Sequence, residues 1–161
     1  MFFFETLVVY KYTNIFRISC VCNTNFKKPL KKKVSFEGIG LHSVKIARVS
    51  LNPATENSGI VFKRTDIKGN NIIKANYQNV SSTNLCTVLK NENNSTISTV
   101  EHLVAAFYIT GIDNVLVEVD NAEIPIMDGS SKDFIEIINS AGIKEQSKKR
   151  KYIKVIKEIE I

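Results

Sequence analysis

From residue 34 onward, short segments alternate apolar and polar residues, and turn-forming residues separate them. This period of two is typical of strands that bury one face. The predicted strands are residues 34–37, 47–51, 59–63, 72–77, 84–89 and 114–120. The pattern therefore predicts a half-buried, mostly antiparallel sheet.

Two further segments have helical spacing instead. The first carries an apolar stripe that ends at Gly111 and consists of Val100, Leu103, Val104 and Phe107. It follows Ser98-Thr99-Val100-Glu101, which has the pattern of a capping box at a helix N-terminus. A glycine after the last apolar position is a common helix stop. We expect a helix from this capping box to Gly111.

The second predicted helix begins at Ser130 or Ser131 and ends at Gly142. Its apolar face consists of Phe134, Ile137, Ile138 and Ala141. The order of the elements predicts an α+β fold in which two helices cover one face of the sheet.

The two ends of the chain do not follow this scheme. Residues 152–161 alternate like a strand up to the last residue, so we expect a domain that is truncated in its last strand. Residues 1–30 form an unexplained extension, and a targeting peptide, a poorly ordered tail and a mistranslated upstream stretch all stay open. Glu5, Lys11 and Arg17 interrupt its apolar residues, so it contains no transmembrane segment.

Composition and charge narrow the class of protein. The chain has 161 residues, of which 43% are hydrophobic, and this is enough for one core. Its formal charge of +6 comes from two clusters, which we interpret as solvated linkers. They are Lys27, Lys28, Lys31, Lys32 and Lys33, and then Lys148, Lys149, Arg150 and Lys151. Without these nine residues the chain would be acidic, so a basic face over the whole domain is excluded.

Few residues could bind a metal or act as a nucleophile. The three cysteines, Cys20, Cys22 and Cys86, are too few for a disulfide scaffold and do not complete a metal knot, so we expect a reducing compartment. Because Cys86 has no nearby base in the sequence, we interpret it as a small buried residue. The only histidines are His42 and His102, and neither has a second ligand four residues later. Local spacing therefore predicts no self-sufficient zinc site.

Glu101 and His102 are the adjacent pair with the clearest chemical potential. The glutamate could act as a general base beside a metal held by the histidine, or it could be acidic only because it caps the helix. Gly38-x-Gly40 predicts a tight turn between strands, because it lacks the rest of a dinucleotide fingerprint. Asp128 fits a turn, or it could orient a ligand.

Six motifs, taken together, resemble a known family. They are Gly38-Ile39-Gly40-Leu41-His42-Ser43, Ser58-Gly59-Ile60-Val61-Phe62-Lys63-Arg64-Thr65-Asp66, Asn84-Leu85-Cys86-Thr87, Ser98-Thr99-Val100-Glu101-His102-Leu103, Gly111-Ile112-Asp113-Asn114 and Ile124-Pro125-Ile126-Met127-Asp128-Gly129-Ser130. Their order and spacing resemble the N-terminal half of the zinc-dependent UDP-3-O-acyl-N-acetylglucosamine deacetylases. The resemblance covers residues 31–161.

The resemblance implies a fold and a site. The family has two similar α+β domains with the active site between them, so this chain would be the first domain and the second is absent. His102 is implied to bind zinc, and Glu101 to act as the general base. Leu85, Cys86 and His42 are implied to border the substrate, whereas Asp113 and Asp128 are implied to hold loops and helix ends.

The implied reaction is hydrolysis of the 2-acetamido group of UDP-3-O-acyl-N-acetylglucosamine, which releases acetate in the committed step of lipid A synthesis in the bacterial cytoplasm. The remaining zinc ligands, a His-x-x-x-Asp pair, belong to the second domain. We therefore expect the chain to be inactive alone unless a second chain completes it. A non-catalytic remnant, or a basic module that binds anions or nucleic acid, is the alternative, although no motif indicates a specific nucleic acid.

One residue departs from the family pattern at a turn. Val44 stands after Ser43 where the family has glycine. A β-branched residue at a positive φ would strain that turn.

Overall fold

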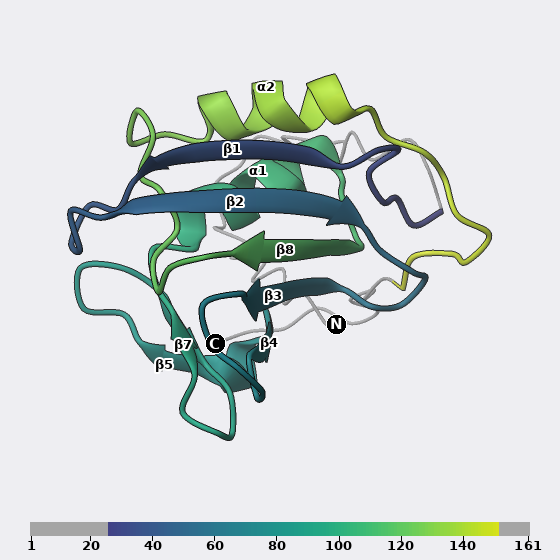
Figure 1. Cartoon of the computed structure of the whole chain (residues 1–161). Helices are drawn as coiled ribbons and strands as arrows, with labels where there is room; N and C mark the ends of the chain where they lie inside the picture. The colour runs from purple at the N-terminus through teal and green to yellow at the C-terminus, as the bar shows by residue number, and fades with distance from the viewer. Residues whose placement is uncertain (1–25, 152–161) are drawn as a thin grey trace, which may run out of the picture.

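The computed structural model describes residues 26–151, so the predicted strand at residues 152–161 and most of the N-terminal extension lie outside it. Its main sheet has five strands in the order β1 (Val34–Ile39), β2 (Ile46–Pro53), β8 (Val115–Val119), β3 (Ile60–Arg64) and β4 (Ile72–Lys74) (Figure 1). Only the β3–β8 pair is parallel; the other three pairs are antiparallel. The mostly antiparallel sheet is therefore confirmed.

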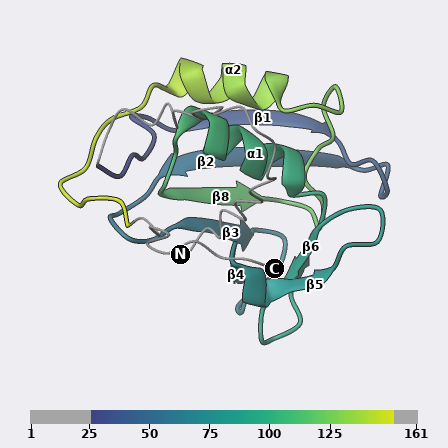
Figure 2. The same ribbon diagram turned by 180° about the vertical axis from the view of Figure 1, so that it is seen from behind.

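Two helices, α1 (Glu101–Thr110) and α2 (Lys132–Ala141), cover one face of this sheet. Seen from behind, α1 lies in front of the strands and α2 runs beside it along β1 (Figure 2). The strands turn their buried side chains to this layer, and Phe62 of β3 is fully buried together with Phe107 of α1 and Phe134 of α2. The predicted α+β fold is confirmed.

The position of α2 follows from its one-sided apolar pattern. Phe134, Ile138 and Ala141 are buried, while the polar positions between them face solvent. The ring of Phe134 meets that of Phe36 on β1 edge to face, with 5.6 Å between centroids. This contact fixes α2 on the sheet.

A smaller sheet of three short strands, β5 (Val80–Ser82), β6 (Val88–Lys90) and β7 (Thr96–Ile97), precedes α1. Here the sequence-based prediction is partly wrong. The strand predicted at 72–77 ends at Lys74 and is followed by a short 3₁₀ helix, Tyr77–Asn79, whose first turn is closed by the Asn76 side chain. The strand predicted at 84–89 begins only at Val88, because Leu85 has a φ of 63°, which no strand accommodates.

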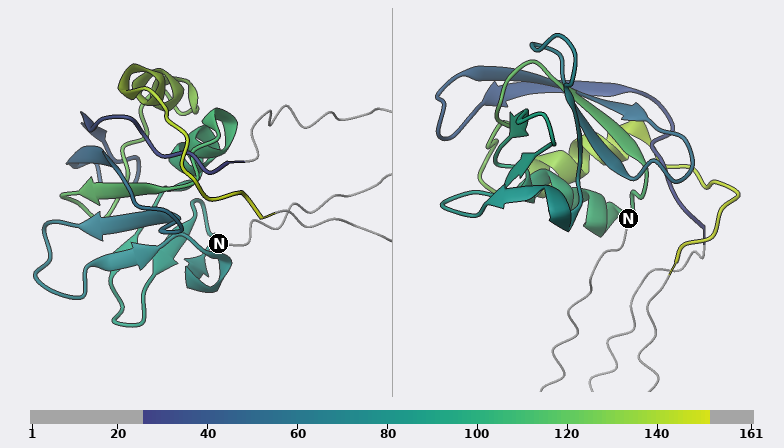
Figure 3. Two further views of the ribbon diagram at one scale, coloured as in Figure 1. Left: turned by 90° about the vertical axis from the view of Figure 1, so that its right-hand side faces the viewer. Right: turned by 90° about the horizontal axis from the view of Figure 1, so that it is seen from below.

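The two lysine-containing segments, 26–31 and 142–149, lie side by side although more than a hundred residues separate them (Figure 3). The amide of Lys27 donates to the carbonyl of Lys148 at 2.9 Å, and the amide of Lys31 donates to that of Gly142 at 2.8 Å. The interpretation as solvated linkers is therefore wrong for these segments, because their backbones are paired and Leu30 is fully buried in the core, although Lys31, Lys148 and Lys149 are exposed.

Within residues 26–151, no helix has both the length and the apolar character that crossing a bilayer requires.

Candidate functional site

The site begins at the N-terminus of α1, where Glu101 is the first helical residue. The predicted capping box is not formed, because Thr99 has a φ of 57° and the helix starts after Val100 without a side-chain cap. Instead, Glu101 Oε2 accepts a hydrogen bond from the backbone N–H of Thr87 at 3.0 Å. Among the described residues Oε1 has no partner. The carboxylate is thus fixed through one oxygen, and the other stays available.

His102 follows on the first turn and is half-buried. Its backbone carbonyl accepts a hydrogen bond from Ser131 Oγ at 2.9 Å, and this bond joins the N-termini of the two helices. Its imidazole makes no hydrogen bond to any residue between 26 and 151. Both ring nitrogens are therefore available to bind a ligand.

The loop that contains Leu85 and Cys86 lies next to Glu101, because Thr87 at its end makes the bond just described. Leu85 is 91% exposed, and its positive φ turns the loop just before β6. Cys86 is a free thiol of intermediate exposure, so its interpretation as a buried residue is wrong. An apolar side chain this exposed on a fixed loop is suited to contact another molecule.

Two more loops meet the same end of α1 at the side chain of Glu123, a residue that the sequence analysis did not select. This side chain is only 2% exposed and lies between β8 and α2. Its Oε1 accepts the N–H of His42 at 2.9 Å and the hydroxyl of Thr99 at 3.0 Å, while Oε2 accepts the N–H of Ser43 at 2.7 Å. Glu123 therefore ties the His42 turn to the residue two positions before Glu101.

The charge on Glu123 follows from these contacts. Burial acts to raise its pKa, but the hydrogen bonds from His42, Ser43 and Thr99 outweigh burial and hold the pKa below the ordinary value of 4.5. The carboxylate is thus ionised at neutral pH and organises three donors around one buried charge.

Gly40 of the first motif makes room for this carboxylate, and Gly38 makes room for the side chain of Pro125. The predicted tight turn between strands is confirmed: Gly38 lies near the end of β1, and Gly40 opens the turn, in which its amide donates to the carbonyl of Lys45 at 2.9 Å. A Cβ on Gly40 would lie 2.5 Å from Glu123 Oε2, and one on Gly38 would lie 2.8 Å from Cβ of Pro125.

Val44 sits in this turn with a φ of 53° and is 77% exposed. The predicted positive φ is confirmed. A β-branched side chain in this region is strained, and no burial compensates for it.

Asp113 and Asp128 hold local structure, as predicted. Asp128 accepts the amide of Ser130 at 2.9 Å and also its hydroxyl, which closes the turn before α2. Asp113 accepts the amide of Lys28 at 2.7 Å and binds the Arg150 guanidinium through two oxygens.

Hydrogen bonds thus bring three loops to the end of α1 that carries Glu101 and His102. One contains His42, one contains Leu85 and Cys86, and one contains Glu123. No hydrogen bond between described residues joins the side chains of His42, Cys86 and His102 to one another. In the described part of the chain, no three His, Cys, Asp or Glu side chains are placed to hold a metal ion. These residues alone do not fit a zinc site, and the individual roles stay predictions.

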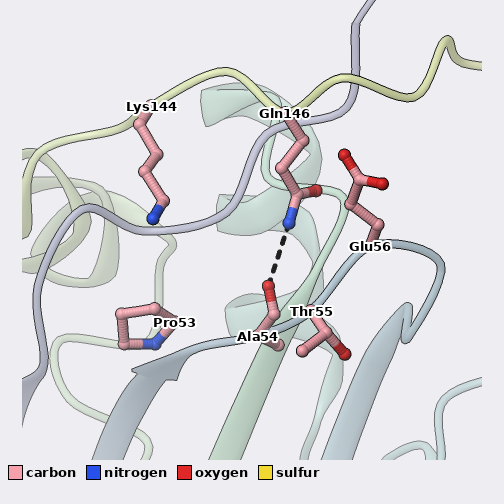
Figure 4. A pocket seen from close by; sticks show the side chains of 6 residues that line it. All are labelled: Pro53, Ala54, Thr55, Glu56, Lys144 and Gln146. Carbon is pink, nitrogen blue, oxygen red and sulfur yellow. Dashed lines mark hydrogen bonds between the residues drawn. The ribbon is translucent and has the colours of Figure 1, made fainter.

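A separate open pocket lies where the β2–β3 loop meets residues 144–146 (Figure 4). In it, Gln146 Nε2 donates to the carbonyl of Ala54 at 3.0 Å. Its lining residues are Pro53, Ala54, Thr55, Glu56, Lys144 and Gln146. None of the candidate site residues lines it.

Comparison with known proteins agrees with the predicted resemblance. The family model of UDP-3-O-acyl N-acetylglycosamine deacetylase matches residues 27–161. The chain is 51% identical over 134 residues to the UDP-3-O-acyl-N-acetylglucosamine deacetylase of Wigglesworthia glossinidia brevipalpis, covering 81% of this chain and 45% of that protein. It is 46% identical over 136 residues to the enzyme of that name from Shewanella frigidimarina, covering 84% and 44%.

The chain thus spans about half the length of the curated relatives it matches. The match includes every motif on which the resemblance was based and both helices of the fold. The chain therefore belongs to the UDP-3-O-acyl N-acetylglycosamine deacetylase family.

Proposed function

We propose that this chain supplies the first part of a zinc-dependent, cytoplasmic deacetylase that hydrolyses the 2-acetamido group of UDP-3-O-acyl-N-acetylglucosamine and releases acetate. The observation that carries the proposal is the convergence of the three loops on Glu101 and His102 at the start of α1. The names of the relatives support the choice of substrate.

Glu101 is the general base of this proposal. Its Oε2 is held by the Thr87 amide, so Oε1 keeps a fixed direction and can take a proton from the attacking water.

His102 is the proposed metal ligand, because its imidazole is free of other partners among the residues described. Zinc, when bound, would polarise the amide carbonyl and activate water. One histidine does not hold a catalytic zinc ion, so the other ligands must come from outside residues 26–151. We infer that the chain needs a second portion of protein, on the same or another chain, for activity.

Leu85, Cys86 and His42 are proposed to border the substrate. Leu85 offers an exposed apolar surface, and His42 is an exposed imidazole whose backbone is fixed by Glu123. The contacts of Thr87 and Glu123 place both loops beside Glu101 rather than at another end of the fold.

The test is to co-express this chain with the C-terminal part of the Wigglesworthia relative and to measure acetate release from the acylated nucleotide sugar. We expect activity from the assembled protein and none from this chain alone. Glu101→Ala should lower kcat by roughly 10²- to 10⁴-fold, as for loss of a general base.

The matched control is Glu92→Ala, an exposed glutamate in the turn between β6 and β7, which should leave kcat unchanged. Full activity of the assembled Glu101→Ala variant would refute the general-base assignment. Release of acetate by this chain alone would show that a second portion is not required.

A further inference from the structure

Two lysine-containing segments that are distant in sequence form one surface, which we call the basic strip, comprising residues 26–33 and 142–151. Their backbones pair through the bonds of Lys27 with Lys148 and Gln146, and of Lys31 with Gly142. Together the two segments contain nine lysines and one arginine but only one acidic residue, Glu145. In Figures 1 and 3 they run next to each other at one end of the sheet.

In the described part of the chain, most lysines of the strip have no carboxylate acting on them, although Lys148 interacts electrostatically with Glu56 and Lys33 with Glu118. Within residues 26–151, none of their ammonium groups takes part in a salt bridge. Lys31, Lys32, Lys33, Lys148 and Lys149 are exposed. The one ion-paired cation of the strip is Arg150, which binds Asp113 and the Gly111 carbonyl at the end of α1. Holding the fold together therefore accounts for Arg150, but not for the charge of the lysines.

The strip and the candidate site lie at opposite ends of the same elements. Lys33 precedes β1 and His42 follows it, while α1 begins at Glu101 and ends next to Arg150. A partner bound to the strip would leave the end with Glu101 open.

The sequence before the strip indicates what that partner is. Residues 2–22 are rich in phenylalanine, leucine, valine and isoleucine, and the family match begins only at residue 27. Stable binding to a bilayer surface typically combines an apolar segment with a polybasic patch. Nucleic-acid surfaces instead interleave aromatic and basic residues, and Phe26 is the one aromatic residue of the strip.

We propose that the basic strip docks this protein on an anionic lipid surface, with the candidate site turned away from it. The lysines supply the attraction to the lipid headgroups, and the preceding apolar residues add to it. This proposal does not depend on the deacetylase activity.

The test is sedimentation of the full chain with vesicles of phosphatidylcholine that do or do not contain phosphatidylglycerol, at low and at high salt. We expect binding only to the anionic vesicles, with loss at high salt, because screening weakens exposed charge interactions. Each lysine near such a surface contributes about fivefold in affinity, so Lys31→Ala, Lys32→Ala and Lys33→Ala together should weaken binding by on the order of 100-fold.

The matched control changes the net charge equally at another place, with Lys68→Ala, Lys74→Ala and Lys90→Ala, and should retain most of the binding. Thermal unfolding of both triple variants should match that of the parent, since all six side chains are exposed. Equal losses in both variants, or equal binding to neutral vesicles, would overturn the proposal. So would tighter binding of the strip to a single-stranded RNA oligonucleotide than to the vesicles at the same salt, which would indicate a nucleic-acid surface.

Discussion

The two ends of the helical layer are held together by different means. At the N-terminal ends of α1 and α2, a buried carboxylate and a helix-terminal glutamate fix three loops through single hydrogen bonds from backbone donors. At the C-terminal ends, two segments pair through their backbones, and Arg150 closes the junction on Asp113. The first end depends on a few charged side chains and leaves loop residues exposed, as a site that must contact a ligand requires.

The strongest way to break this contrast is Glu123→Ala. The change leaves the amides of His42 and Ser43 and the hydroxyl of Thr99 without their common acceptor in a buried place. Hydrogen bonds to charged groups contribute about 1.5–3 kcal/mol each, so we expect the free energy of unfolding to fall by about 3 kcal/mol or more. Urea unfolding measures this loss. Glu37→Ala, on the exposed face of β1, is the control and should cost little.

At the opposite end, Arg150→Ala should cost about 2 kcal/mol. It removes a two-pronged ion pair with Asp113 and a bond to the Gly111 carbonyl, in a place where the arginine side chain is 11% exposed. If the two ends are independent, the Glu123→Ala, Arg150→Ala double variant should lose the sum of the single losses. A clear departure from additivity in urea unfolding would contradict that independence.

The dependence of stability on pH should also distinguish the two ends of the helical layer. Because hydrogen bonds hold the pKa of Glu123 below 4.5, its contribution to stability is complete above that value and is lost as pH falls through the lowered pKa. The parent should therefore lose more stability than Glu123→Gln when unfolding is measured between pH 6 and pH 3. Parallel pH profiles for the two proteins would show that Glu123 does not carry this effect.

The smallest expected effect concerns the strained turn next to His42. Val44→Gly removes a β-branched residue at a φ of 53° without exposing any core. We expect a gain of about 1 kcal/mol, visible as a higher Tm in thermal unfolding. Val44→Ala keeps a Cβ and should gain less. A Tm of the glycine variant that is equal to or lower than that of the parent would contradict the strain.

Much of the fold could be predicted because the relevant residues have one-sided patterns. Helix α2 is an example, since Phe134, Ile138 and Ala141 face the core and charged residues face solvent. The short strands β5 and β7 could not be predicted, because two or three residues paired through their backbones leave no period to detect. The prediction of a capping box at α1 was wrong, because the Glu101 carboxylate accepts a hydrogen bond from the backbone amide of Thr87 instead.

The site was predictable only in part, for a related reason. Glu101 and His102 could be found because their residue types suit the chemistry and their neighbours match a family. Glu123 could not, because its partners include backbone amides some eighty residues away, and an amide has no signature in the sequence.

The pairing of residues 26–31 with 142–149 also brings together two points near the two ends of the described part of the chain. Because Phe26 bridges to Lys149, a short linker could join these two points without disturbing the sheet. New ends could then be opened at the exposed turn of Lys68, Gly69 and Asn70, which lies between β3 and β4. The fold of residues 26–149 is therefore suited to circular permutation.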